Sequence, residues 1–150
     1  MTSATVHASA VLTGARAVLI RGPSGSGKSR LAFDLIEAGY GGRLRFARLV
    51  ADDRVHLKAA DGRLLASPAE KLAGLIEVRG AGLLRLPHEA CAVVGLVVDL
   101  AAADASRLPE DARRRSEIEG ISLPRLPVAA GAAALPMVLA VINSAPDSWV

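Results

Sequence analysis

Apolar and polar segments alternate along this chain of 150 residues without an internal repeat or a linker. Two apolar runs, residues 6–12 and 15–20, flank Thr13-Gly14, which predicts a hairpin near the amino end. Leucine and isoleucine then recur three to four positions apart, and this spacing predicts a helix that begins near Lys28 and ends at Gly39. The chain therefore opens with a strand pair followed by a helix.

Short apolar segments that predict strands dominate the rest of the chain. In chain order they are residues 49–51, 55–59, 64–66, 75–78, 93–100 and 126–128. Asp61-Gly62 predicts a second hairpin, and residues 104–120 form a polar stretch. Residues 126–142 are uncharged but too short for a comfortable membrane span. They predict a buried strand, a turn and a buried helix that opens near Pro136. Together these elements predict a single α/β domain.

A glycine-rich motif lies between the second predicted strand and the first helix. Its residues are Gly22, Pro23, Ser24, Gly25, Ser26, Gly27, Lys28 and Ser29, a full match to the phosphate-binding loop (P-loop) pattern. The glycines let backbone N–H groups turn around a β-phosphate, and the helix directs its positive dipole end at the same anion. We expect Lys28 to reach the β and γ oxygens and Ser29 to place its hydroxyl on Mg²⁺. The motif predicts binding of a nucleoside triphosphate.

Composition narrows the classes of partner and compartment. The formal net charge of +3 suits an acidic nucleotide or protein partner. Aromatic residues make up only 3% of the chain, so no stacking platform for nucleic acid is expected. Cys91 is the only cysteine, which excludes an internal disulfide, and we expect it to be buried as a small apolar residue. With no secretory signal and no membrane span predicted, we expect a cytoplasmic protein.

Phosphoryl transfer needs one carboxylate to orient Mg²⁺ and another to accept the substrate proton, and two predicted strands end on acids. Residues 49–51 end on the pair Asp52-Asp53, and residues 96–98 end on Asp99. Adjacent acids beside a polyphosphate repel each other unless a cation lies between them, and this cost favours the pair as the active-site candidate. For Asp99 we favour an ordinary strand-terminal residue that caps a turn.

Three segments together resemble the catalytic domain of HPr kinase/phosphorylase, the bacterial enzyme that phosphorylates a serine of the phosphocarrier protein HPr. They are the phosphate loop, Val-Ala-Asp-Asp-Arg-Val at residues 50–55 and Ile-Glu-Val-Arg-Gly-Ala-Gly-Leu at residues 76–83. The Glu-Val-Arg-Gly-x-Gly part is that family's own signature. The likeness spans residues 6–142, nearly the whole chain. It implies a P-loop-containing sandwich related to phosphoenolpyruvate carboxykinase.

The resemblance also implies an organisation and a partner. Residues 1–150 correspond to the catalytic domain alone, as in a short proteobacterial form with no separate N-terminal domain. Full-length members assemble as hexamers, so a homo-oligomer is expected. The substrates are ATP, with Mg²⁺, and an HPr-type phosphocarrier protein.

The family's site residues carry over to matching positions. Lys28 holds the phosphates, and Ser29 and Glu77 hold the metal. Asp53 accepts the proton of the substrate serine. His7 lies on the strand before the loop, at the family's spacing for an active-site histidine, and supports the site.

Other positions match less closely. Arg107, in Ser-Arg-Leu, occupies the place of a further active-site arginine. Arg30 stands where the family usually has an acidic residue. An extra segment at residues 41–48, which contains three arginines, lengthens the chain between the helix and the aspartate pair. We expect neither departure to touch the chemistry.

A third departure bears on the direction of the reaction. Pro-Val-Ala-Ala-Gly-Ala at residues 127–132 stands where the family has a Pro-Val-Arg-Pro-Gly-Arg type loop, which is associated with the reverse, dephosphorylating reaction. Ala129 and Ala132 replace both arginines. We therefore expect mainly kinase activity, with doubtful phosphorylase activity.

Two other functions stay open. A small-metabolite kinase on an ordinary phosphate-loop fold would place Asp99 on the metal and use residues 104–120 as a lid over the substrate. A nucleotide-binding regulatory module without transfer activity would have no need of both Asp53 and Glu77 near the γ-phosphate.

Overall fold

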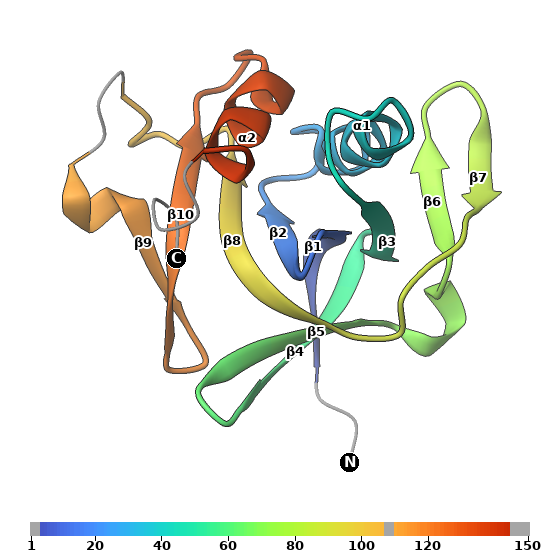
Figure 1. Cartoon of the computed structure of the whole chain (residues 1–150), viewed down its shortest axis with the longest axis horizontal. Coiled ribbons are helices and arrows are strands. Elements are labelled where there is room, and N and C mark those ends of the chain that lie inside the picture. The colour runs from blue at the N-terminus through green and yellow to red at the C-terminus, as the bar shows by residue number, and fades with distance from the viewer. Residues whose placement is uncertain (1–3, 107–109, 145–150) are drawn as a thin grey trace.

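The most apolar predicted strand, β8 (Ala92–Leu100), lies in the middle of the sheet in the computed structural model, which describes residues 4–106 and 110–144 (Figure 1). It pairs in parallel with β2 (Arg16–Arg21) and β10 (Ile121–Val128), and antiparallel with β5 (Arg63–Pro68). Parallel strands need protection on both faces. Apolar side chains on both faces of β8 supply it, since Val97 and Val98 are each fully buried.

The remaining elements surround this strand. The other strands are β1 (Thr5–Thr13), β3 (Ala47–Ala51), β4 (Arg54–Ala60), β6 (Leu75–Val78), β7 (Gly82–Arg85) and β9 (Arg115–Ile118). The helices are α1 (Lys28–Tyr40), α2 (Ala134–Ile142) and the short 3₁₀ helices η1 (Glu70–Leu72) and η2 (Asp111–Arg114).

Eight strands form one sheet in the order β2-β1-β4-β5-β8-β10-β9, and β3 pairs with β1. The additional pairing of β2 with β8 closes a ring of strands through β1, β4 and β5. The strands β6 and β7 form a separate two-stranded hairpin, seen at the right of Figure 1. Both α1 and α2 lie at the end of the sheet where β2 and β8 have their carboxyl ends (Figure 1).

Alternation along the strands divides the buried apolar side chains between two clusters. Val98 and Leu100 of β8 pack toward the cluster that contains Leu31 and Leu35 of α1. Val97 packs into the other cluster, which is rich in alanine and includes residues of β1, β2 and β5. Full burial of a Val or Leu side chain is worth about 1.5–3 kcal/mol. The period-two pattern of β8 therefore fixes which of its side chains face each cluster.

Most predicted elements are confirmed. Both hairpins form, with Asp61 and Gly62 at φ 52° and 74° in the second turn. The predictions missed β7 and β9, two strands of four residues each in segments without a clear alternating pattern. Helix α1 extends one residue beyond Gly39 because the N–H of Gly41 still donates to the carbonyl of Glu37, 2.9 Å away.

Two burial predictions are wrong. Cys91 is exposed, since it lies just before β8 enters the sheet. Helix α2 is only partly buried: Val138 and Leu139 face the core, whereas Met137 is 37% exposed. A helix on the surface buries one stripe, however apolar its other faces are.

Gly39 is required for the packing of α1 on β3. A Cβ atom at this position would lie 2.7 Å from the Cβ of Ala47 and 3.0 Å from its backbone nitrogen. Gly41, at the end of the same helix, has only an ordinary contact, 3.4 Å from the carbonyl oxygen of Glu37. Of these two glycines, only Gly39 lies too close to a neighbouring strand to accept a side chain.

We predict that Gly39→Ala destabilises the protein by about 1–3 kcal/mol, because the added methyl forces α1 away from β3. Thermal unfolding by circular dichroism measures the loss. Gly41→Ala is the matched control and should change the free energy of unfolding by less than about 1 kcal/mol. A Gly39→Ala protein as stable as the wild type would contradict this account of the helix packing.

Candidate active site at the amino end of α1

The phosphate-loop motif connects β2 to α1 and leaves the amino end of the helix open. Gly27 is the N-cap residue, with a left-handed φ of 100°, and its carbonyl accepts the N–H of Leu31. No side chain caps this end, and no acidic residue lies in its first turn. Backbone N–H groups at such a terminus bind anions readily.

Polar groups inside the loop fit a phosphate ligand. Lys28 is 9% exposed, and its Nζ donates to the carbonyl oxygens of Gly22 at 2.8 Å and Pro23 at 3.2 Å. The Ser26 hydroxyl is buried and has no hydrogen-bond partner in the part of the chain that the structure describes. A Cβ at Gly22 would lie 2.5 Å from that hydroxyl and 3.2 Å from the backbone carbonyl oxygen of Leu100. Because the φ of Gly22 is also 155°, which L side chains rarely adopt, the turn requires glycine.

The carboxylate of Asp52 is the centre of the polar contacts beside the loop. It is 5% exposed and accepts three donors from different parts of the chain. The Ser29 hydroxyl lies 2.7 Å from Oδ1 and 2.9 Å from Oδ2, the Ser9 hydroxyl lies 2.7 Å from Oδ1, and the backbone N–H of Glu77 lies 3.1 Å from Oδ2. These bonds satisfy a buried charge that would otherwise be costly.

Asp53, the next residue, faces the opposite way. It adopts a left-handed φ of 68°, which is uncommon outside glycine, and its side chain is 62% exposed. Its Oδ1 lies 3.6 Å from Nδ1 of His7, whose side chain is 61% exposed. The structure therefore brings His7 and Asp53 together at the surface, next to the buried Asp52.

For two of the predicted site residues, Glu77 and Arg107, the described part of the structure shows no side-chain contact in the site. Glu77, on β6, has an exposed side chain, and its backbone rather than its carboxylate contacts Asp52. No group of three or more His, Cys, Asp or Glu side chains with metal-binding geometry occurs within residues 4–106 and 110–144. Arg107 lies outside the described residues.

Asp99 takes part in an ion-pair network instead of capping a turn. Its carboxylate accepts Nε and Nη2 of Arg21 at 2.7 and 2.8 Å, and also Nε of Arg125. Arg125 in turn donates to both oxygens of Asp104. Burial raises the pKa of Asp99, but the hydrogen bonds and positive charges of the two arginines outweigh it and hold that pKa below its ordinary value.

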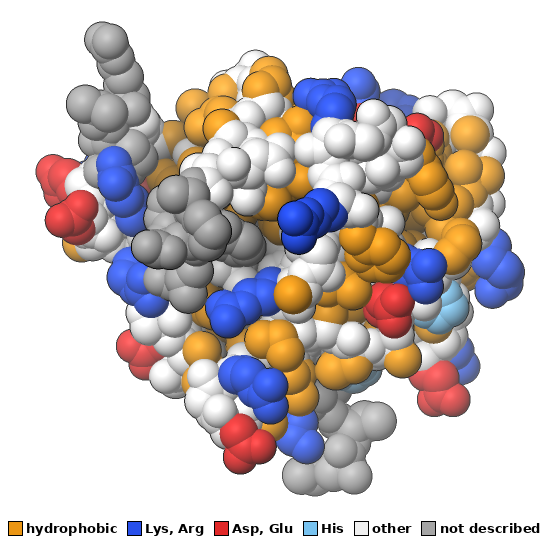
Figure 2. Space-filling model, in the orientation of Figure 1, with side chains coloured by type: hydrophobic (Ala, Val, Ile, Leu, Met, Phe, Trp, Pro, Cys, Tyr) orange, Lys and Arg blue, Asp and Glu red, His pale blue; other side chains and the backbone are white. Residues whose placement is uncertain are grey.

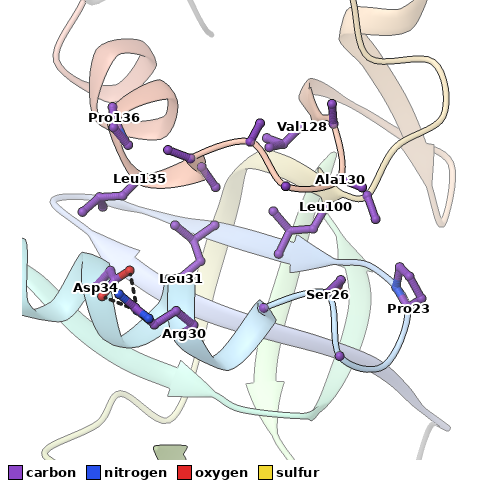
Figure 3. A pocket seen from close by; sticks show the side chains of 18 of the residues that line it. Pro23, Ser26, Arg30, Leu31, Asp34, Leu100, Val128, Ala130, Leu135 and Pro136 are labelled. Atoms are coloured by element: carbon purple, nitrogen blue, oxygen red, sulfur yellow. Dashed lines mark hydrogen bonds and ion pairs between the residues drawn. The ribbon is translucent and has the colours of Figure 1, made fainter. Parts of the chain in front are cut away.

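A pocket of about 520 Å³ opens beside the phosphate loop (Figure 3). The loop, with Arg30, Leu31 and Asp34 of α1, forms one wall, and the segment from Val128 to Pro136 forms the other. Arg30 is paired with Asp34, 3.1 Å away, as the dashed lines in Figure 3 show. The facing segment contributes mainly alanine, so this wall offers methyl groups and backbone amides in place of charges.

The surface carries mixed charges. On the face drawn in Figure 2, Lys and Arg side chains lie in separate groups among apolar and acidic ones. Among the described residues, no helix has the length and the apolar character that a membrane crossing requires. The prediction that nucleic acid is not a partner stays a prediction.

Sequence reasoning singled out the aspartate pair but assigned no role to Asp52, and it missed Ser9. The available signal was the isolated hydroxyl in the otherwise apolar run of residues 8–12. A polar side chain in a buried strand needs a partner, and here the partner is Asp52. The partner itself could not be predicted, because the two residues are 43 positions apart.

Comparisons with known proteins show which family the chain resembles. The family model of the HPr Serine kinase C-terminal domain matches residues 1–145. HPr kinase/phosphorylase from Clostridium tetani is 43% identical over 70 residues, and that from Streptococcus pneumoniae is 39% identical over 121 residues. These alignments cover 47% and 73% of this chain, respectively, but only 21% and 36% of the relatives. The chain thus matches only a part of each.

One solved structure shares the fold over almost its full length. The HPr(Ser) kinase/phosphatase from Coxiella burnetii superimposes with a TM-score of 0.75 at 24% sequence identity. The match covers 94% of this chain and 95% of that one. The predicted single-domain α/β fold is therefore confirmed.

We predict that Asp99→Asn lowers the free energy of unfolding at pH 7 by about 1.5–3 kcal/mol, the usual worth of hydrogen bonds to charged groups. Because the folded-state pKa is depressed, this stabilisation is present above the unfolded pKa of about 3.9 and is lost as pH falls through the folded value. Urea titrations between pH 3 and 7 should show the two proteins converging below about pH 4. A stability difference that does not depend on pH would contradict the assignment.

Proposed function

Because the chain belongs to the family of HPr serine kinase C-terminal domains, we propose that it transfers the γ-phosphoryl group of ATP to a serine of an HPr-type phosphocarrier protein. The observation that carries the proposal is the convergence of Ser29, Asp52, Asp53 and His7 at the open amino end of α1. A phosphate-binding loop, a buried metal-side carboxylate and an exposed carboxylate are the parts that phosphoryl transfer requires.

The loop is proposed to bind the phosphates of ATP. The amino end of α1, the buried ammonium of Lys28 and the Ser26 hydroxyl, which has no partner among the described residues, supply donors for an anion. The adjoining pocket has room for the remainder of the nucleotide. Its alanine-rich wall favours apolar contact over charge pairing in that part of the site.

Mg²⁺, when bound, neutralises charge on the β and γ phosphates. We propose that the Ser29 hydroxyl and the Glu77 carboxylate hold it. Asp52 accepts a hydrogen bond from the Ser29 hydroxyl, which leaves the lone pairs of that oxygen available to the cation. The Glu77 N–H donates to the same Asp52 carboxylate, so one buried charge positions both proposed ligands.

Asp53 is proposed to accept the proton of the substrate serine. Its exposed carboxylate can be reached by a hydroxyl on another protein, whereas Asp52 is enclosed by its three donors. His7, 3.6 Å away, supports Asp53 from the neighbouring strand. Arg107 is proposed as a further active-site residue by resemblance alone.

A small-metabolite kinase receives less support, because it would need Asp99 on the metal. That carboxylate is already bound to Arg21 and Arg125. A regulatory module without transfer activity is also less well supported, since an exposed carboxylate beside His7 has no task in it. The relation to phosphoenolpyruvate carboxykinase and a homo-hexameric assembly complete the proposal by resemblance. A cytoplasmic location is proposed from the sequence, which has a single cysteine and no predicted secretory signal.

We predict that Asp53→Asn leaves ATP binding largely intact and reduces transfer to a purified HPr-type protein by roughly 10²–10⁴-fold, because the serine proton loses its acceptor. Transfer of label from γ-³²P-ATP measures this effect. Asp61→Asn is the matched control, because Asp61 is also an exposed aspartate with positive φ but lies in the β4–β5 turn. Full transfer by Asp53→Asn would remove Asp53 from the mechanism. No transfer by the wild type would refute the proposed function.

We also predict that the chain acts mainly as a kinase, because phosphorolysis must hold a second anion and arginine does this best. Arg125, one substitute for the missing loop arginines, is occupied by Asp99 and Asp104. Phosphate-dependent release of label from phosphorylated HPr should be weak and should rise in the Ala129→Arg, Ala132→Arg double variant. The corresponding double Gln variant controls for side-chain size. Vigorous phosphorolysis by the wild type would show that this loop does not set the direction.

A further inference from the structure

Ser9 occupies an unusual place on β1, where the ladder to the next segment of chain is interrupted. Strand β1 pairs with β3 up to Ala51 and with β4 from Arg54, so Asp52 and Asp53 separate two ladders on the same strand. Ser9 lies opposite this interruption and is fully buried. Its hydroxyl contacts both members of the aspartate pair.

The two contacts use the hydroxyl both as a donor and as an acceptor. It donates to Oδ1 of Asp52 at 2.7 Å, and it accepts the backbone N–H of Asp53 at 3.3 Å. The first contact is to the carboxylate that accepts the hydrogen bond of the Ser29 hydroxyl. The second is to the residue that turns to a φ of 68° and exposes its carboxylate. One side chain thus touches the buried and the exposed half of the site.

We propose that Ser9 is a positioning residue of the active site. Its hydroxyl fixes the rotation of the Asp52 carboxylate toward Ser29 and holds the backbone of Asp53 in its left-handed turn. The inference rests on the proposed function, since its effect is expressed through Mg²⁺ and nucleotide at the loop.

Removal of the hydroxyl has a specific consequence. In Ser9→Ala, the Asp52 carboxylate keeps Ser29 and the N–H of Glu77 but loses the donor that sets its rotation. Loss of a partner that orients a metal site commonly weakens metal affinity by 10–100-fold. A merely structural serine would instead lower stability without a change in the Mg²⁺ requirement.

The test measures the Mg²⁺ concentration that gives half-maximal binding of a fluorescent ATP analogue, at a temperature where every variant is folded. Ser9→Ala should raise this concentration about tenfold. Ser9→Thr, which keeps the hydroxyl, should restore it to within about twofold of the wild-type value, because only the hydroxyl is required. Thr13→Val is the matched control, because it removes the other buried hydroxyl of β1, which donates to the carbonyl of Arg16 away from the site.

A wild-type Mg²⁺ requirement in Ser9→Ala would overturn the inference while leaving the proposed function intact. Equal shifts in Ser9→Ala and Thr13→Val would also overturn it, because the effect would then be one of strand stability. If the wild-type chain itself binds no nucleotide with Mg²⁺, both the proposed function and the inference fail. Should Ser9→Ala not fold, Ser9→Cys, whose thiol is a weak donor, makes the same comparison.

Discussion

The geometry of the site depends on the hydrogen bonds that the buried carboxylate of Asp52 accepts. Its donors come from β1, from the first turn of α1 and from β6. Each element approaches the others in a fixed orientation, because an unpaired charge in this position would be strongly unfavourable. The same bonds set where Ser29 lies relative to the phosphate loop and bring the β6–β7 hairpin, with its family signature, beside it.

Asp52 and Asp53 show how adjacent identical residues acquire different tasks. The backbone turns to the left-handed region at Asp53, and the carboxylate of this second aspartate is exposed. Without that turn, β3 and β4 would continue as one strand along β1. The interruption therefore supplies one enclosed and one accessible carboxylate, as the proposed function requires.

A second group of charges stabilises the sheet and not the site. Asp99 and Arg21, at the carboxyl ends of β8 and β2, are joined to Arg125 within β10 on the face opposite to the α1 cluster. Arg21 directly precedes the phosphate loop, so this network anchors the strand from which the loop begins. The acid at the end of the most apolar strand is thereby used for structure, which agrees with a role for the aspartate pair in chemistry.

The sequence by itself determined the features that depend on neighbouring residues. The phosphate loop, both hairpins, α1 and the apolar strands follow from local spacing, and the signature beginning at Glu77 indicated the family. Only the tertiary structure decided which aspartate is enclosed, that Ser9 contacts both, and that Asp99 is paired with arginines. These outcomes rest on contacts between residues 23 to 78 positions apart and on one left-handed backbone turn. Local propensity carries no information about such contacts, because the partners meet only when the sheet closes.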